Sequence, residues 1–457
     1  MKLNEIDRFL LDREGRVQLQ EQLLQEYNKC TLVTVRVNYP GLAKSNFITD
    51  KIQTVISDEI NEICNEVIVS KEKYKSLEGY ITHFLIDLDC LSTKKLMINI
   101  EENHILGRCV DIDVYKLNED KIFTISRRDL GKGNRSCFLC KLDANICSRK
   151  QSHSINEIKL YFENKYNEYI NYLKKREIIS SKLCNLALKS IISEVSTYPS
   201  FGLVSPISSG AHNDMDYYTF LDSAFAIVPY LKKMAEKGYS YDSEENIFRK
   251  IREVGQKSEE EMFKATKGIN THKGMIFLMG IVIAGVSKNI YDKKSFGNIQ
   301  KIIKSMVKDI LDDFKKLDKK EILSHGEKLY KKYKFTGIRG QVSDGLDFIF
   351  NKILTEYKEL KLELKGNDLY SHTLLILMSE VEDSTIVYRH DIDTLKKVHK
   401  DCKNLLNLGG MITDEGKKLA LELELEYIDR HISPGGSADL LSIVIFLDEV
   451  YDTFYKI

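Results

Sequence analysis

Proline is scarce in this sequence. Five prolines occur in 457 residues, and four of them (Pro199, Pro206, Pro229 and Pro434) follow Glu163. Because proline breaks helices, its rarity leaves room for long uninterrupted helical segments. Internal repeats and low-complexity tracts are also lacking, which excludes a solenoid or a collagen-like chain.

Net charge is lacking as well. Lys+Arg and Asp+Glu number 68 each, so the formal net charge is zero. Proteins that bind nucleic acid or membrane surfaces through a long-range electrostatic field carry an excess of charge of one sign. We therefore expect no nucleic-acid partner and no membrane partner, and only local basic clusters can matter.

A long hydrophobic run is missing too. The longest uncharged apolar stretch, Gly274–Ser287, has 14 residues, whereas a bilayer-spanning helix needs about 20. The first residues, MKLNEIDRFLLDREGR, mix both charges and lack the cationic start and apolar run of a secretory signal. Nine cysteines in such a chain predict reduced thiols or metal ligands rather than disulfides. We expect a cytoplasmic protein.

The two halves of the chain differ in composition. Seven of the nine cysteines precede residue 150, and a chain of this length is expected to form two to four domains. Apolar recurrence at helical spacing predicts a helix over 48–63. Four β-rich segments predict strands over 30–37, 81–88, 110–115 and 122–126.

From about Glu163 the sequence becomes helical in character, with Lys/Glu-rich faces. Helices are predicted over 302–314 and 419–428, and 159–176, which lacks Gly and Pro, is predicted to be a connecting helix. The sequence thus predicts a multidomain protein. Residues 1–165 form an α/β domain with a small sheet, and residues 166–457 form an all-α domain.

Asp111 and Asp113 stand two apart in a β-rich run, so both carboxylates should project from one face of a strand. Paired carboxylates suit Mg²⁺ together with substrate phosphates. A D-x-D in a strand is also typical of a solvated edge, and Asp87-Leu88-Asp89 is a second copy. Four arginines surround the first pair and offer forked donors for a polyphosphate; they are Arg108, Arg127, Arg128 and Arg135. The same loop also fits an ordinary exposed basic turn.

Cys137, Cys140, Cys147 and His153 follow this loop with the spacing C-x2-C-x6-C-x5-H. Three thiolates and an imidazole could close a tetrahedral structural Zn²⁺ site. The alternative is a set of reduced, inert thiols.

The segments LGRCVDIDVY, ISRRDLG and RSCFLCKLDANICSRKQSHS, with DREGRVQLQEQLL and VRVNYPGLAKSN before them, occupy residues 12–154. In this order they resemble the apo-citrate-lyase phosphoribosyl-dephospho-CoA transferase family. The resemblance implies transfer of a phosphoribosyl-dephospho-CoA group to a serine of the citrate lyase acyl carrier protein (gamma chain), with release of diphosphate. It further implies nucleotidyltransferase-like chemistry, with Asp111 and Asp113 as Mg²⁺ ligands. Asp87 and Asp89 remain unassigned.

Three unusual stretches stand out in the helical half. They are SFGLVSPISSGAHNDMDYYTFLDS (200–223), TKGINTHKGMIFLMG (266–280) and SPGGSADLL (433–441). Polar loops that lead into helix N-termini are ready phosphate sites. Taken singly, each stretch is equally typical of helix caps or of the start of a buried helix.

Together these stretches resemble the triphosphoribosyl-dephospho-CoA synthase family over residues 178–452. Two departures from that family, Gln341 and the His390 that follows Arg389, weaken any role for Gln341 and for 382–389. The resemblance implies that the ribose C1′ of ATP is joined to the 2′-hydroxyl of 3′-dephospho-CoA and that adenine is expelled. Such a substitution needs a carboxylate near C1′ and a proton donor for the base.

From these stretches we expect Asp214, Asp216 and Asp222 to be catalytic, with Mg²⁺ at Asp214 and Asp216. Substrate and phosphate contacts are expected from His212, Asn270, His272, Lys273, Gly435, Gly436, Ser437 and Asp439. Two alternatives stay open. One is an equivalent pair of reactions that serves malonate decarboxylase, and the other is a non-catalytic scaffold that binds a carrier protein.

Overall fold

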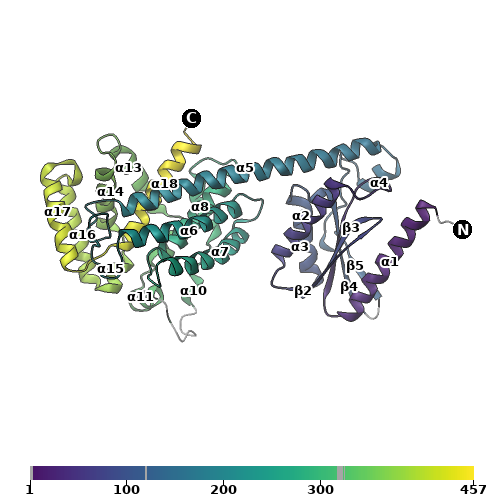
Figure 1. Cartoon of the computed structure of the whole chain (residues 1–457), viewed down its shortest axis with the longest axis horizontal. Helices are drawn as coiled ribbons and strands as arrows, with labels where there is room; N and C mark the ends of the chain where they lie inside the picture. The colour runs from purple at the N-terminus through teal and green to yellow at the C-terminus, as the bar shows by residue number, and fades with distance from the viewer. Residues whose placement is uncertain (1–3, 119–120, 316–322, 324, 457) are drawn as a thin grey trace. The chain divides into compact units, whose positions relative to one another are not determined.

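The computed structural model describes residues 4–118, 121–315, 323 and 325–456. The chain divides into two compact units, Met1–Lys175 (unit 1) and Arg176–Ile457 (unit 2). The division falls inside one helix, α5 (Ile155–Val195), which includes the connecting helix predicted over 159–176. Figure 1 shows the helices and strands of both units.

Unit 1 is built on a five-stranded antiparallel sheet with the strand order β2-β3-β1-β4-β5. Its elements are α1 (Glu5–Glu26), β1 (Thr31–Val37), α2 (Phe47–Ile63), β2 (Ile68–Ser76), β3 (Gly79–Ile86), α3 (Cys90–Asn103), β4 (Val110–Asn118), β5 (Lys121–Ile125) and α4 (Ala144–Arg149). The predicted helix over 48–63 and all four predicted strands are confirmed. Sequence patterns did not predict α1, β2, α3 or α4.

The two faces of this sheet differ. Val33, Val35 and Val37 of β1 pack with Ile52 and other apolar residues into the main core of the unit. Helices α2 and α3 cover this face, and α1 lies on the other (Figure 1). Because strand side chains alternate, the residues between the valines point toward α1. On β1 this second face carries the polar side chains of Thr34 and Arg36 beside the apolar Leu32.

Unit 2 is helical in its described part, with a single isolated β-bridge between Ser205 and Ser208. Its helices are α6 (Tyr217–Gly238), α7 (Glu244–Ala265), α8 (Lys273–Tyr291), α9 (Asn298–Met306), α10 (Asp312–Lys315), α11 (His325–Tyr333), α12 (Gly337–Ser343), α13 (Leu354–Leu360), α14 (Asn367–Glu380), α15 (Ser384–Arg389), α16 (Ile392–Asn407), α17 (Asp414–Asp429) and α18 (Gly435–Phe454). A π-helical turn, Ile349–Ile353, precedes α13. The predicted combination of a small sheet with helices and a helical C-terminal part is confirmed.

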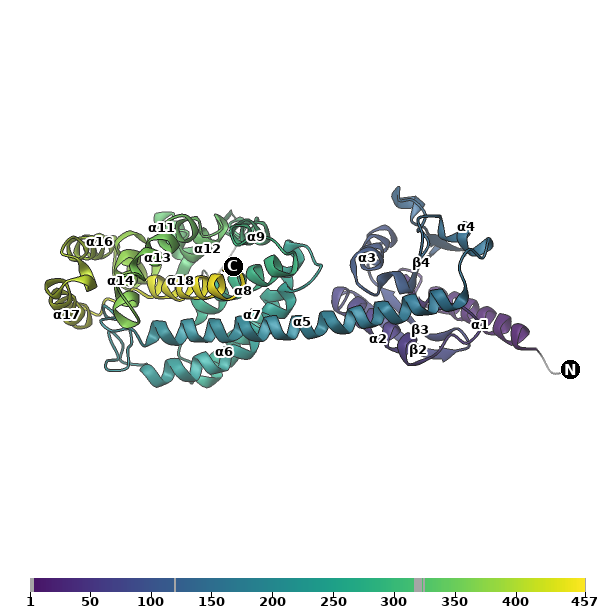
Figure 2. The same cartoon turned by 90° about the horizontal axis from the view of Figure 1, so that it is seen from above.

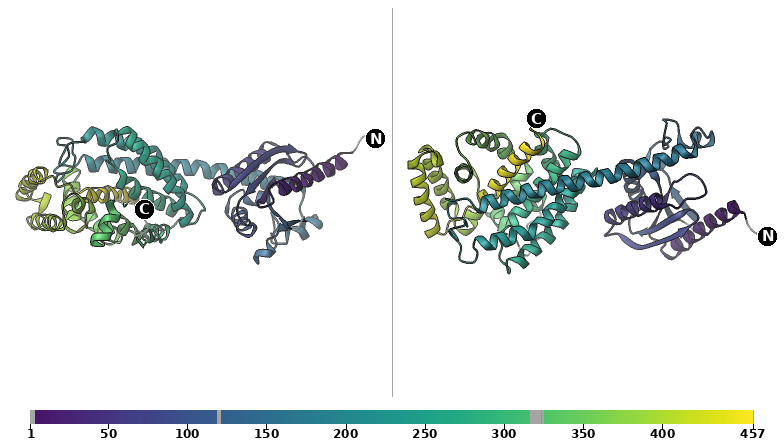
Figure 3. Two further views of the ribbon diagram at one scale, coloured as in Figure 1. Left: turned by 90° about the horizontal axis from the view of Figure 1, so that it is seen from below. Right: turned by 45° about the horizontal axis from the view of Figure 1, so that its top comes forward.

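Helices α8 and α18 form the centre of unit 2. Almost every residue of α8 from Met275 to Asn289 is buried, and most of α18 is buried as well. In Figures 2 and 3, α18 (yellow) runs through the middle of the unit with other helices around it. By length and composition α8 would also pass as a membrane span, but 78% of its apolar window is buried inside the unit.

The single helix predicted over 302–314 is wrong. Helix α9 ends at Met306, the chain turns, and α10 begins at Asp312. The Ile310 N–H donates to the Val307 carbonyl at 2.9 Å, which closes the turn. Ile310 and Phe314 are still buried. Their helix-like spacing reflects a packed turn, which apolar periodicity alone does not distinguish from a helix.

Candidate functional site

Strand β4 presents Asp111 and Asp113 together on the face of the sheet that points toward α1. Val110, Ile112 and Val114 alternate with them and are buried in the opposite face. The two carboxylate side chains remain 29% and 31% exposed, so a ligand can reach them.

Arg36 lies directly opposite Asp111 in the β1–β4 register. Its Nη2 is 3.2 Å from Asp113 Oδ2 and 3.8 Å from Asp111 Oδ2, and its Nη1 donates to Glu78 Oε2 at 3.0 Å. Burial lowers the pKa of Arg36, but the carboxylates of Asp113, Asp111 and Glu78 raise it more. Arg16 of α1 also donates to Glu78, at 2.8 Å, and thereby fixes that buried carboxylate. Glu78, itself fixed by Arg16, therefore holds Arg36 in place beside the two aspartates.

Arg135 reaches the same carboxylates from the basic loop. Its Nη1 donates to Asp111 Oδ1 at 2.7 Å, and its Nη2 pairs with Glu101. Glu101 is 1% exposed and accepts the Ile112 N–H at 3.0 Å. Arg127 pairs with Glu101 and with the neighbouring Glu102. The structure thus brings Arg135 to the aspartate pair, and it joins Arg127 to the carboxylates of α3.

Two other predicted arginines make different contacts. Arg108 donates to the Ser136 carbonyl at 2.5 Å, and its guanidinium lies over the Phe138 ring. Burial and the charge of Arg135 lower the pKa of Arg108. Arg128 donates to Asn134 Oδ1 at 3.3 Å. Neither of these contacts involves Asp111 or Asp113.

A small cationic pocket of about 170 Å³ opens beside Asp111. Burial and the charge of Arg36 lower the pKa of Lys44, one of its lining residues. The pocket offers cationic side chains next to a carboxylate, which suits a phosphate group that carries a metal ion. Its lining residues are Phe9, Arg13, Arg36, Val37, Asn38, Lys44, Glu78 and Asp111.

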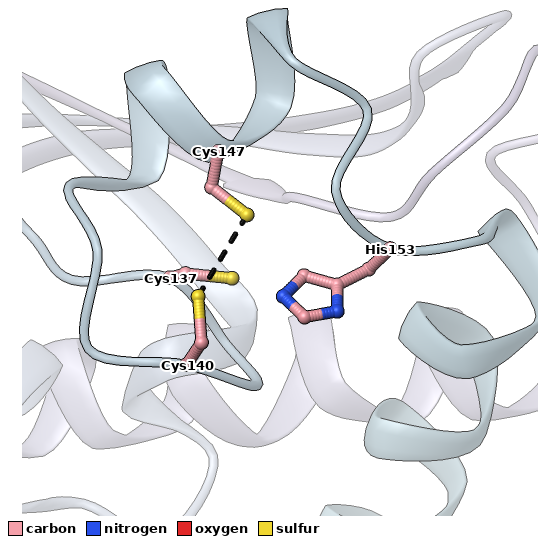
Figure 4. A group of neighbouring side chains, drawn as sticks. All are labelled: Cys137, Cys140, Cys147 and His153. Carbon is pink, nitrogen blue, oxygen red and sulfur yellow. Dashed lines mark hydrogen bonds between the residues drawn. The ribbon is translucent and has the colours of Figure 1, made fainter.

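The cysteine cluster predicted from spacing is assembled in space. The ligand atoms of Cys137, Cys140, Cys147 and His153 all lie within 4.8 Å of one another. Figure 4 shows the three sulfur atoms and the imidazole converging on one point. Burial raises the pKa of Cys137, but N–H groups of Leu139 and Cys140 and the neighbouring thiols lower it more, to about 7. One thiol of the cluster is therefore close to ionisation at neutral pH.

In unit 2 the unusual stretches meet, although they are far apart in the sequence. His212 of the first stretch is joined to Ser433 of the third by a hydrogen bond of 3.0 Å. Ser223 of the first is joined to His272 of the second by one of 2.6 Å. Arg389 lies 3.4 Å from His212, so the 382–389 segment belongs to the same group.

Three acidic residues gather where α18 begins. Asp383 accepts the N–H and the hydroxyl of Ser437 at 2.8 and 3.0 Å, and a Cβ at Gly436 would lie 3.1 Å from its Oδ1. Burial, Glu194 and Asp383 together raise the pKa of Asp439 well above its usual range. Burial raises the pKa of Glu194 to about 8. Asp439 nevertheless keeps partial solvent exposure.

The predicted aspartates of the first stretch lie in more exposed settings. Asp216 is the N-cap of α6 and accepts the Thr219 N–H at 2.8 Å, a bond that lowers its pKa. The Asp214 side chain is 64% exposed, and its Oδ1 lies 3.9 Å from His212 Nδ1. Asp222 is exposed on α6. Helix capping therefore explains the position of the Asp216 side chain at least as well as metal binding does.

The second stretch forms the start of α8. Asn270 Oδ1 accepts the Lys273 N–H at 3.3 Å, and Lys273 Nζ pairs with Glu259 at 2.8 Å. His272 is fully buried, which lowers its pKa to about 4, and its Nε2 has no hydrogen-bond partner among the described residues. Gly274 contacts Asp439, because a Cβ placed on it would overlap Asp439 Oδ2.

A pocket of about 540 Å³ lies along α7 and α8. Arg249, Arg252 and Arg339 line it together with Phe248 and Phe277, so it combines cationic and aromatic groups. Glu259, the partner of Lys273, belongs to the same lining. These features suit a nucleotide, whose base stacks and whose phosphates need positive charge.

Several site residues were not predicted from the sequence, namely Arg36, Glu78, Glu101, Glu194 and Asp383. Arg36 stands inside VRVNYPGLAKSN, one of the segments that carries the resemblance, and that position is the signal that could have identified it. Asp383 lies in the 382–389 segment that was set aside because of its departures. Glu194 lies within α5 and carries no local signal.

Comparisons with known proteins agree on both units. The family model of the apo-citrate lyase phosphoribosyl-dephospho-CoA transferase (CitX) matches residues 4–169. The family model of the ATP:dephospho-CoA triphosphoribosyl transferase (CitG) matches residues 180–456.

Individual relatives span both units or one. The chain is 32% identical to Protein CitXG of Leuconostoc mesenteroides subsp. cremoris over 455 residues, which cover 95% of each chain. It is 29% identical to Protein CitXG of Haemophilus influenzae over 462 residues, 96% of this chain and 95% of the relative. A probable 2-(5''-triphosphoribosyl)-3'-dephosphocoenzyme-A synthase of Streptococcus pyogenes serotype M49 is 33% identical over 284 residues, 59% of this chain and 96% of that relative.

Proposed function

The chain belongs to the family of bifunctional transferases that join an apo-citrate lyase phosphoribosyl-dephospho-CoA transferase to an ATP:dephospho-CoA triphosphoribosyl transferase, and we propose that its two units carry out these reactions in sequence. Unit 2 makes 2'-(5''-triphosphoribosyl)-3'-dephospho-CoA from ATP and 3'-dephospho-CoA and releases adenine. Unit 1 transfers the phosphoribosyl-dephospho-CoA group to a serine of the citrate lyase acyl carrier protein and releases diphosphate.

One observation carries this proposal: each compact unit contains its own group of carboxyl side chains. In unit 1 these are Asp111 and Asp113 with Arg36 and Arg135. In unit 2 the carboxyl group of Asp439 lies at the start of α18, among stretches that are distant in the sequence. Two separate sites are what two consecutive reactions on one cofactor require.

For unit 1 we infer nucleotidyltransferase-like chemistry. The exposed oxygens of Asp111 and Asp113 fit Mg²⁺, since both lie on one strand face and are hard ligands. When bound, Mg²⁺ would supply positive charge to the phosphates as the diphosphate leaves. Arg36 and Arg135 are placed to bind the same phosphates, because each already contacts one of these carboxylates. The serine hydroxyl of the carrier protein attacks the α-phosphorus of the triphosphate, which is esterified to the ribose that came from ATP. The bond between this phosphorus and the departing diphosphate breaks.

For unit 2 we infer that Asp439 donates the proton that adenine needs in order to leave. Its raised pKa favours the protonated carboxyl group, which is the form required of a general acid. Glu194, also protonated near neutral pH, lies close enough to influence Asp439. Asp214 is exposed beside His212 and remains the candidate ligand for the Mg²⁺ ion that would bind the triphosphate. Lys273 is a further cation for these phosphates.

Both reactions are assigned to the cytoplasm. All nine cysteines lie outside disulfide bonds, and a reducing compartment keeps cysteines in that state. The malonate alternative is less favoured, because the transferase model that matches unit 1 is the citrate lyase one.

A coupled assay tests the proposal. The purified chain is incubated with ATP, 3'-dephospho-CoA and Mg²⁺, free adenine is measured by HPLC, and the mass of the added acyl carrier protein is measured by mass spectrometry. We expect adenine release without the carrier protein and a phosphoribosyl-dephospho-CoA mass increase when it is present. A non-catalytic scaffold would release no adenine.

A further inference from the structure

We propose that Cys137, Cys140, Cys147 and His153 bind one structural Zn²⁺ ion, and that this ion positions Arg135 against Asp111. The metal site stands on the geometry of the four side chains alone. Its consequence for carrier loading rests on the function proposed above.

The distances between the donor atoms fit a tetrahedral zinc site. A Zn–S bond of about 2.3 Å places two thiolates of a tetrahedron about 3.8 Å apart. The Cys140 and Cys147 sulfur atoms lie 3.9 Å apart, and all four ligand atoms lie within 4.8 Å of one another. A small contraction of the cluster would bring every donor to bonding distance.

The histidine supplies an independent observation. His153 Nε2 is buried and has no hydrogen-bond partner within the described part of the chain. In Figure 4 this nitrogen, the ring nitrogen farther from the backbone, faces the sulfur atoms. Buried polar nitrogens are normally satisfied, and a metal ion between this nitrogen and the sulfur atoms satisfies it here.

The donor set selects zinc and a structural role. Thiolate and imidazole ligands favour Zn²⁺ over Mg²⁺, which prefers oxygen. Four protein ligands leave no open position for a substrate. Three thiolates around Zn²⁺ leave one negative charge, and Lys141, Arg149 and Lys150 lie in the same segment.

The cluster is tied to the transferase site through the backbone. The Cys137 N–H donates to the Leu142 carbonyl at 2.7 Å, and the Ala144 N–H donates to the Arg135 carbonyl at 2.9 Å. Arg135, two residues before Cys137, reaches Asp111 at 2.7 Å. A metal ion that fixes this loop therefore fixes the direction of the Arg135 side chain.

Metal content is the primary test. The full chain is purified without chelators, and zinc and iron are measured by mass spectrometry. We also compare Cys140→Ser and His153→Ala with Cys90→Ser, a partly exposed thiol of α3 outside the cluster. The wild type and Cys90→Ser should hold about one zinc per chain, and both cluster variants should lose it. A cobalt-substituted wild type should show the absorption of tetrahedral thiolate coordination.

Activity supplies the second measurement. In Cys140→Ser, carrier loading should fall by about 10- to 100-fold, whereas adenine release should be unchanged. A wild type that contains no zinc and takes up neither zinc nor cobalt, or one that contains iron instead, overturns the metal site. Normal loading by metal-free Cys140→Ser overturns the positioning of Arg135. If no protein loads the carrier, the proposed function fails, and the zinc content still decides the metal site.

Discussion

Gly274 and Asp439 lie against each other at the starts of α8 and α18. The space that a Cβ at Gly274 would need is occupied by Oδ2 of Asp439. Glycine at this position lets the two helix starts approach, and their approach puts a carboxyl group beside the second unusual stretch. Two predictions for unit 2 follow from this contact.

The substitution Gly274→Ala should displace the Asp439 carboxyl group and lower adenine release by about tenfold or more, because small misplacements of reacting groups are costly. Gly297→Ala is the matched control, since a Cβ there meets no atom within 4 Å. HPLC of free adenine measures the effect. Equal activity in the two variants would contradict the importance of the contact.

The substitution Asp439→Asn keeps the shape of the side chain and removes its ionisable proton. We expect adenine release to fall by about 10²- to 10⁴-fold, the usual contribution of a general acid. Carrier loading from supplied triphosphoribosyl-dephospho-CoA should stay normal, because unit 1 has its own site. Asp222→Asn, on the exposed side of α6, tests the aspartate predicted from the sequence. A larger loss of adenine release in Asp222→Asn than in Asp439→Asn would contradict the assignment of Asp439 as the general acid.

In unit 1, Asp111→Asn and Asp113→Asn should stop carrier loading while the intermediate still accumulates. The amides lose the charge that holds Mg²⁺ and orders Arg36, so transition-state stabilisation should fall by roughly 3 kcal/mol. The mass of the carrier protein measures loading directly. Asp87→Asn serves as the control, because Asp87 is exposed at the end of β3. Near-normal loading by both variants would show that other carboxylates bind the metal.

Glu194 predicts a pH dependence of stability. Its folded pKa is raised from 4.5 to about 8, so the folded chain retains a proton that the unfolded chain releases above pH 4.5. Stability is therefore lost as the pH rises from about 4.5 to about 8. Glu194→Gln removes this dependence. Between pH 5 and 7.5 the wild type should lose roughly 1–3 kcal/mol more of its free energy of unfolding than the variant. Urea denaturation of the full chain, followed by the helical circular dichroism signal, measures this. Parallel pH profiles would contradict the burial of an ionisable Glu194.

Separate expression should give two active fragments. Phe162 is buried in the core of unit 1, and Tyr166 and Tyr169 pack on Phe47 and His104. The fragments should therefore be divided at Lys175 rather than at Lys165. We expect residues 176–457 to release adenine and residues 1–175 to load the carrier protein when they are given the intermediate. Loss of adenine release in the isolated fragment, with activity in the full chain, would show that the units depend on each other.

The sequence by itself determined the local features of this protein. The alternation of side chains along a strand placed Asp111 and Asp113 on one face, and cysteine spacing identified a cluster of residues that could bind a metal ion. Helical periodicity located α2 and α17. It failed at Val307, where a buried turn has the apolar spacing of a helix. These features depend on residues a few positions apart, so a local pattern contains the information.

Only the tertiary structure decided which charged groups meet. Arg36 lies opposite Asp111 because of the β1–β4 register, across 75 residues of chain. Glu194 of α5, Asp383 at the start of α15 and Asp439 of α18 come together although they are far apart in the sequence, and α18 packs against both α15 and α8. Strand register and helix packing join positions that no short pattern connects. For that physical reason Asp439, whose pKa is raised well above its usual range, was expected from the sequence only as a phosphate contact.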